Sequence, residues 1–167
     1  MAQTEQSEME KRYHTVSIWL ATKSTDKLII FLKAAFNAKE LGRVYTPDGS
    51  IGHAEVQIGD SKILMFDLKP GWPAFRSLIH LYVDNADEMY ENALNAGAKS
   101  MTRLTTHFWG DRGGRVIDPF GNIWWINSHV DDVSAEEMGK RAKQPEFIEA
   151  MDYAQKSFTP FLPADSL

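Results

Sequence analysis

The stretch THFWGDRGGRVIDPFGNIWWINSH, residues 106–129, carries most of the signals that decide the fold. Asp118-Pro-Phe-Gly121 has the residues of a tight turn, and the residues on both sides of it predict strands. Three glycines accompany Arg112 and Arg115, which predicts a loop where the backbone can approach a ligand. The stretch therefore predicts two strands around a turn, with an arginine loop beside them.

The rest of the chain predicts one order of elements that occurs twice. Each copy begins with a strand and an amphipathic helix and continues with further strands. The first copy has a strand at 14–22, a helix at 24–38 capped by Ser24 or Thr25, and strands within 41–59 and 61–68; the second has a strand at 77–84, a helix at 85–98 ending near Gly97, and strands within 113–127. Two later helices are predicted, the first opened by a Ser134/Glu137 capping box and the second from Pro145 to about Ser157.

Matching landmarks indicate that the two copies are a duplicated βαβββ unit. Trp19 matches Leu81 and Gly59 matches Gly121, at the same offset, since 81 − 19 = 62 and 121 − 59 = 62. We therefore expect an α+β fold in which modules at about 13–70 and 77–130 form one domain, 13–130. A polar tail, 1–12, precedes this domain and a helical extension, 131–167, follows it.

Four segments together resemble the vicinal oxygen chelate superfamily, which includes glyoxalases, bleomycin resistance proteins and dioxygenases. They resemble its PhnB-like branch in particular. The segments are FLKAAFNAKELGR, DGSIGHAEVQIGDSKILMFD, HLYVDNADEMYENALNAGAK and WGDRGGRVIDPFGNIWWINSHVDDVSAEEM. The resemblance implies paired βαβββ modules in an open, concave mixed sheet around a ligand pocket, and commonly a homodimer. It also implies, for the enzymes of the superfamily, a divalent metal held by the first and last strands of the modules.

The residues at the implied metal positions cannot bind a metal. These positions fall on Val16 and Leu78 in the first strands and on Ile63 and Trp125 in the last strands. Carbon side chains cannot replace water around a divalent cation, and a shift of one residue brings in no good ligand. We therefore expect no metal of the usual kind and no cofactor.

Composition excludes several classes of partner and site. The net charge of −5 forms no basic stripe for nucleic acid, and the absence of cysteine excludes disulfides and thiolate metal sites. No apolar run is long enough for a membrane span, and the first residues lack the apolar core of a signal peptide. We expect a cytoplasmic homodimer with a small-molecule ligand.

Strand periodicity selects the candidate ligand-binding residues. Alternation places His53 and Glu55 on one face of a strand and His80 and Tyr82 on the pocket face of another, with Trp125 also directed into the pocket. His53 and Glu55 could act as a base and its orienting partner, or as ligands of an unusual metal site with His80. They could equally be solvated or bonded across strands on a wet sheet face.

The arginine loop adds a candidate with a charge. Arg115 is expected to pair with Asp118 and fix the loop, which leaves Arg112 at the pocket mouth to bind a carboxylate or phosphonate. His107 and His129 are isolated in the sequence and are expected at the surface or as caps.

Two functions follow from these residues. The first is a PhnB-like protein of unassigned activity that binds a small organic molecule, acidic or aromatic, in a concave pocket without the usual metal centre. The alternative is a metal-dependent lyase or dioxygenase with a rearranged His/Glu site.

Overall fold

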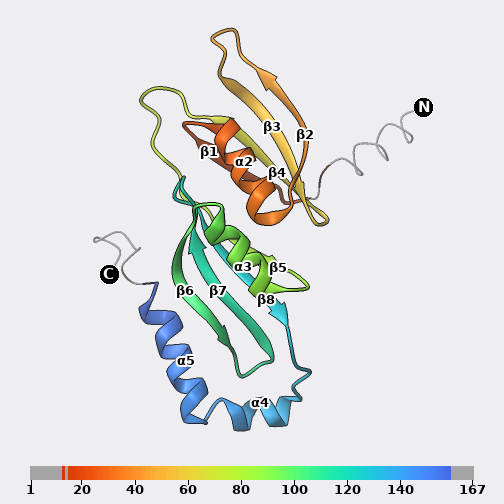
Figure 1. The fold of residues 1–167 in the computed structure, drawn as a ribbon, viewed down its shortest axis with the longest axis vertical. Coiled ribbons are helices and arrows are strands. Elements are labelled where there is room, and N and C mark those ends of the chain that lie inside the picture. Colours follow the sequence, from red (N-terminus) through yellow and green to blue (C-terminus); the bar gives the residue numbers. More distant parts are fainter. Residues whose placement is uncertain (1–12, 14, 159–167) are drawn as a thin grey trace, which may run out of the picture. The chain divides into compact units, whose positions relative to one another are not determined.

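The computed structural model describes residues 13 and 15–158 of the 167-residue chain. The chain divides into two compact units, Met1–Arg76 and Ser77–Leu167. Each unit has one four-stranded mixed sheet with a helix packed across one face (Figure 1). This arrangement confirms the predicted α+β fold of two βαβββ modules. None of the helices in the described ranges is long and apolar enough to cross a membrane.

The first unit contains one complete βαβββ module. Its elements are β1 (Ile18–Thr22), α2 (Thr25–Phe36), β2 (Lys39–Tyr45), β3 (Ile51–Ile58) and β4 (Ser61–Asp67). The strand order is β1-β4-β3-β2; β1 runs parallel to β4, and the other neighbours are antiparallel. The predicted Pro-Asp-Gly turn joins β2 to β3.

The second unit repeats this topology and adds two helices. Its elements are β5 (Leu78–Tyr82), α3 (Ala86–Asn95), β6 (Lys99–Thr106), β7 (Asp111–Ile117), β8 (Ile123–His129), α4 (Ala135–Arg141) and α5 (Pro145–Lys156). The order β5-β8-β7-β6 again has one parallel pair, β5 with β8. The matching orders confirm the duplication that the landmarks predicted.

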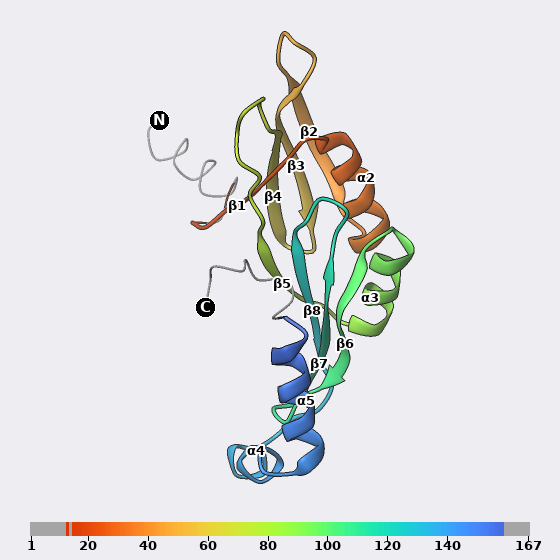
Figure 2. The same ribbon diagram turned by 90° about the vertical axis from the view of Figure 1, so that its left-hand side faces the viewer.

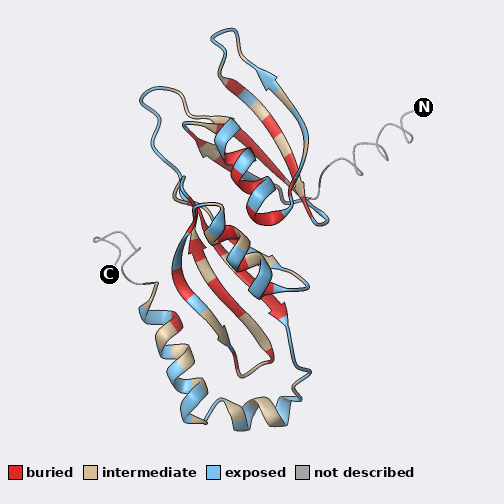
Figure 3. Cartoon of the chain, in the orientation of Figure 1, coloured by how far each residue is buried: buried red, intermediate tan, exposed pale blue. Residues whose placement is uncertain are grey.

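One face of each sheet forms a core with the helix of its own module. In the first unit, Leu28 and Leu32 of α2 are fully buried, as are Leu20, Val56 and Met65 of the strands. Buried and accessible residues alternate along the strands, as a pleated sheet with one covered face requires (Figure 3). We call the face of each sheet opposite α2 or α3 its open face; Figure 2 shows both helices on one side only of their own sheets.

Helix capping agrees with the sequence at α3 and α4 and differs at α2. Ser134 accepts a hydrogen bond from the backbone N–H of Glu137, as the predicted capping box requires. Ser24 precedes α2 but its side chain makes no capping bond. Asp67 takes this role from β4, 42 residues away, by accepting from the backbone N–H of Thr25 at 2.7 Å. The predicted local cap was wrong because β4 pairs with β1 and brings Asp67 to the start of α2.

The offset between the two modules differs from the predicted 62 by one residue in the first and last strands. Trp19 and its partner Leu64 lie on the open face of the first sheet, as His80 and its partner Trp125 do in the second, so residues on equivalent faces are offset by 80 − 19 = 61. Ile63 therefore lies on the helix-covered face, where it is 2% exposed. The β3–β4 turn occupies two residues between paired positions and the β7–β8 turn five, so counting from the glycine of each turn leads to opposite faces.

Candidate functional site

The open face of the first sheet holds a histidine–glutamate pair among aromatic rings. His53 Nε2 and Glu55 Oε1, both on β3, are 2.8 Å apart, and Tyr13 donates a hydrogen bond to the same carboxylate. The Trp19 ring packs edge-on against His53, with centroids 5.5 Å apart. The side chain of His53 is 32% exposed and that of Glu55 is 13% exposed. This contact allows Glu55 to orient the imidazole, and it gives His53 Nε2 and Glu55 Oε1 a hydrogen-bond partner.

The open face of the second sheet holds another imidazole among aromatic rings. The ring centroid of His80 lies 5.3 Å from that of Trp125 and 6.0 Å from that of Tyr82. β5 and β8 place these side chains together because His80 and Trp125 are parallel-strand partners. Strand alternation thus located all three correctly. The prediction that they share one pocket with His53 and Glu55 joins residues of both units and stays a prediction.

Arg112 and Arg115 lie in different surroundings from those that the sequence predicted. Both belong to β7 and not to a loop. Arg112 pairs with Ser128 and faces the helix, where its Nε and Nη2 donate to the two carboxylate oxygens of Asp87, each at 2.8 Å. This ion pair joins β7 to the first turn of α3. Arg112 is therefore engaged on the helix side, away from the open-face residues.

Arg115 lies on the open face, and its predicted pairing with Asp118 is wrong. Its guanidinium carbon is 4.5 Å from the centroid of the Trp125 ring, and its Nη1 donates to Thr102 Oγ1 at 3.2 Å and to the carbonyl oxygen of Ala154 at 2.8 Å. Positions 112 and 115 are three residues apart in a regular strand, so the two side chains must point to opposite faces.

Asp118 stabilises the turn between β7 and β8. It is 4% exposed, and its carboxylate accepts from the backbone N–H groups of Phe120 and Asn122, from Asn122 Nδ2 and from Trp124 Nε1, at 2.8–3.0 Å. These four donors occupy the carboxylate. The turn is structural, as the sequence predicted.

A network around Asp111 was not predicted. Its carboxylate accepts hydrogen bonds from Tyr82 Oη at 2.8 Å and Trp109 Nε1 at 2.9 Å, and contacts His129 Nδ1 at 3.3 Å. Burial alone would raise the pKa of Asp111, but these three contacts outweigh it and lower the pKa. The pKa of His129 is raised by its contact with Asp132 and, to a smaller extent, with Asp111. The signal in the sequence is alternation, which puts residues 111, 113 and 115 on one face.

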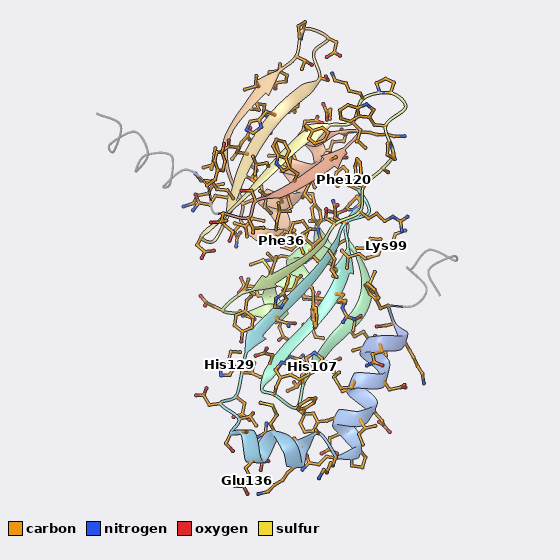
Figure 4. All side chains as sticks on the ribbon, turned by 180° about the vertical axis from the view of Figure 1, so that it is seen from behind. Phe36, Lys99, His107, Phe120, His129 and Glu136 are labelled. Atoms are coloured by element: carbon orange, nitrogen blue, oxygen red, sulfur yellow. The ribbon has the colours of Figure 1, made fainter. Side chains whose placement is uncertain are left out.

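His107 is buried, which corrects the prediction of a surface or capping role. It is 3% exposed and stacks on Trp109 with ring centroids 4.3 Å apart and an interplanar angle of 3°. Its Nδ1 has no hydrogen-bond partner within residues 13 and 15–158. Burial lowers its pKa, and the nearby cation of Arg115 lowers it further. Figure 4 labels His107 and His129 at one end of the second sheet.

The sequence of residues 12–126 matches the model of the Glyoxalase/Bleomycin resistance protein/Dioxygenase superfamily. The chain belongs to this superfamily. An uncharacterised protein of Mycobacterium tuberculosis, Rv0887c, is 38% identical over 121 residues, which cover 66% of this chain and 71% of that protein. The protein YjdN of Escherichia coli is 35% identical over 86 residues, 48% of this chain and 58% of its own length.

Several solved structures are similar to this chain in fold. TioX from Micromonospora sp. ML1 covers 70% of this chain and 99% of its own, with a TM-score of 0.60 and 22% identity. PA1353 from Pseudomonas aeruginosa covers 71% and 99%, with a TM-score of 0.60 and 20% identity. The fosfomycin resistance protein FosX from Listeria monocytogenes, solved with Mn(II) and sulfate, covers 77% and 96%, with a TM-score of 0.53 and 20% identity. At these identities the likeness concerns the fold.

The residues of the first and last strands do not fit the superfamily metal centre. With the observed register, the central open-face pair of the first and last strands is Trp19 with Leu64 in the first module and His80 with Trp125 in the second. Of these four, only His80 has a side chain that binds divalent metals readily. Nor does any group of three or more His, Asp or Glu side chains suited to a metal ion occur within the described ranges.

Proposed function

We propose that this protein is a PhnB-like member of the superfamily that binds a small organic molecule, acidic or aromatic, without the usual metal centre. The branch assignment is supported by the four segments that resemble PhnB-like proteins, from FLKAAFNAKELGR to the WGDRGGR and DPFGN motifs. The binding role is supported by the side chains on the open faces.

The observation that carries the proposal is the cluster of His80, Tyr82 and Trp125. Tyr82 is 57% exposed although its ring lies on a sheet face beside that of His80, and His80 is also exposed. Exposed aromatic side chains gathered on one face are unfavourable in water and are typical of binding sites. Their flat surfaces can stack on a planar ligand, and the imidazole can form a hydrogen bond with it.

The test measures binding of simple planar compounds. Indole, benzamide and benzoate are added to the protein while the side-chain signals of His80 and the tryptophans are followed by NMR. At least one of the three is expected to shift the signals of His80 and Trp125, and Trp125→Leu should weaken that binding roughly threefold to tenfold. The control is Trp72→Leu, which removes a 53% exposed tryptophan from the first unit. If none of the three compounds shifts these signals at millimolar concentration, the binding proposal is wrong.

A metal measurement separates this proposal from the lyase or dioxygenase alternative. Protein purified without chelating resin is expected to contain far less than one divalent metal ion per chain, because Trp19, Leu64 and Trp125 cannot bind a metal and leave His80 as the one ligand among the four strand partners. A ratio near one that falls to zero in both His53→Ala and His80→Ala would instead establish the rearranged metal site.

A further inference from the structure

Arg115 is a half-buried cation without a carboxylate partner in the described residues. Arg43, Arg112 and Arg141 each bind a carboxylate, whereas Arg76, Arg103 and Arg115 form no ion pair with one among the described residues. Toward the described residues, Arg115 uses only Nη1 for hydrogen bonds, to a hydroxyl and a backbone carbonyl. Its Nε and Nη2 have no acceptor among the residues that the structure describes, so one edge of the guanidinium retains its donors.

Aromatic rings flank this guanidinium. Its carbon lies 4.5 Å from the centroid of Trp125 and 5.3 Å from the centroid of Phe158. The rings attract the cation through their π faces and restrict the directions in which it can move. They also remove water, and this burial lowers the pKa of Arg115. A desolvated cation gains strongly from an anion that binds its free donors.

The helix α5 supplies one wall of this arrangement. It runs beside β6, as Figures 1 and 2 both show. Ser157, just after α5, contacts Thr102 of β6 with hydroxyl oxygens 2.7 Å apart, and Tyr153 Oη accepts a hydrogen bond from the backbone N–H of Arg103. These contacts fix the end of α5, so that the carbonyl of Ala154 and the ring of Phe158 reach Arg115. The C-terminal extension thus contributes to the open face of the second module.

We propose that Arg115 binds the oxyanion of the ligand, a carboxylate or phosphonate attached to a planar body, and that α5 forms part of this subsite. The inference rests on the proposed function and names the class of ligand for it. The free edge of the guanidinium, Nε and Nη2, has the spacing to donate two parallel hydrogen bonds to two oxygens of one anionic group. The planar body of the ligand lies against Trp125 and His80.

The test compares ligands of equal size and different charge by calorimetry. Benzoate and phenylphosphonate provide the two anions, and benzamide is the neutral counterpart of benzoate. At least one anion is expected to bind the wild-type protein roughly tenfold or more tightly than benzamide, and Arg115→Gln should remove this preference. Phe158→Ala should reduce the affinity for the anion by a smaller factor than Arg115→Gln does. The anion that binds more tightly identifies the charged group of the ligand.

Two further variants make the test specific to this guanidinium. Arg115→Lys keeps the charge but not the planar edge, so it should retain only part of the preference for the anion. Arg112→Gln removes an equal charge from the helix side of the same strand and should leave anion affinity within about twofold, since that arginine is paired with Asp87.

The outcomes separate this inference from the proposal on which it rests. If benzamide and the anions bind equally well at Trp125 and Arg115→Gln changes neither, the oxyanion subsite is refuted while small-molecule binding stands. If only indole binds, the oxyanion subsite is refuted and the proposed function stands; if neither indole nor any of these three compounds binds, both are refuted. If Arg112→Gln abolishes anion binding and Arg115→Gln does not, the anion binds on the other face and the inference is wrong.

Discussion

Replacing Asp118 tests the structure at the turn that joins β7 to β8. Asp118→Ala removes four acceptor contacts from a residue that is 4% exposed, and it leaves Asn122 Nδ2 and Trp124 Nε1 without their partner. A hydrogen bond to a charged group contributes about 1.5–3 kcal/mol, but contacts in one network are not additive. Breaking a buried network of this kind is expected to lower the free energy of unfolding by about 3–5 kcal/mol.

A conservative variant and a surface control sharpen this measurement. Asp118→Asn keeps the shape of the side chain but turns an amide N–H₂ toward one pair of donors. We therefore expect the free energy of unfolding to decrease by about 2–3 kcal/mol. The control is Asp152→Asn in α5, where an exposed ion pair with Lys156 at i,i+4 is worth about 0.5 kcal/mol or less. Urea unfolding followed by tryptophan fluorescence measures all three.

Two results would refute the reasoning. A loss below about 1 kcal/mol in Asp118→Ala would show that the four contacts do not stabilise the turn. Because Arg115 does not contact Asp118, the coupling energy between Asp118→Asn and Arg115→Gln should be close to zero. A coupling energy above about 1 kcal/mol would instead support the Arg115–Asp118 ion pair that the sequence predicted.

Three other predictions concern pH, packing and assembly. The pKa of the His107 imidazole is lowered in the folded chain, so the unfolded chain takes up this proton at a higher pH than the folded chain does. The contribution of His107 to the free energy of unfolding should therefore be complete above the unfolded pKa of about 6.5 and should decrease as the pH falls below it. His107→Phe keeps the stack on Trp109 and should reduce this dependence of the unfolding free energy on pH, measured by urea titrations at each pH. Gly113→Ala should lower the unfolding free energy by about 3 kcal/mol because the new Cβ would lie 1.6 Å from Asn127 Oδ1, whereas Gly42→Ala meets no atom within 4 Å and should cost far less. Sedimentation should give a homodimer of about 38 kDa, twice the 18.9 kDa of one chain, and a species of single-chain mass at micromolar concentration would contradict this.

Local patterns in the sequence located most of the elements in order, but they missed β6 (Lys99–Thr106), which only the duplication implied. Turn residues, capping residues and the alternation of apolar residues are read over a few positions, and they predicted two βαβββ modules and both later helices. Alternation along single strands also directed His53, His80 and Trp125 to the open faces, because the side of a strand on which a residue lies depends only on counting within that strand.

The role of the two arginines depended on tertiary packing. The glycines near Arg112 and Arg115 predicted a loop, yet they lie in or beside a regular strand. Gly113 is required because Asn127 packs against its Cα, and Gly114 because the backbone of Thr102 approaches closely. Both arginines lie within β7 and are three residues apart, so their side chains point to opposite faces of the sheet. Only the sheet register decides which of the two reaches the open face.

Contacts between residues far apart in the chain decided the remaining features. Asp67 caps α2 across 42 residues, and Ala154 of α5 reaches Arg115 across 39. No local pattern encodes such pairs, because the energy of each contact depends on the packing of whole elements that first bring the partners together. The sequence by itself determined the modules and which strand faces carry the rings and imidazoles. Only the tertiary structure decided which cation stands beside those rings, because burial and pairing are properties of the assembled sheet and helix.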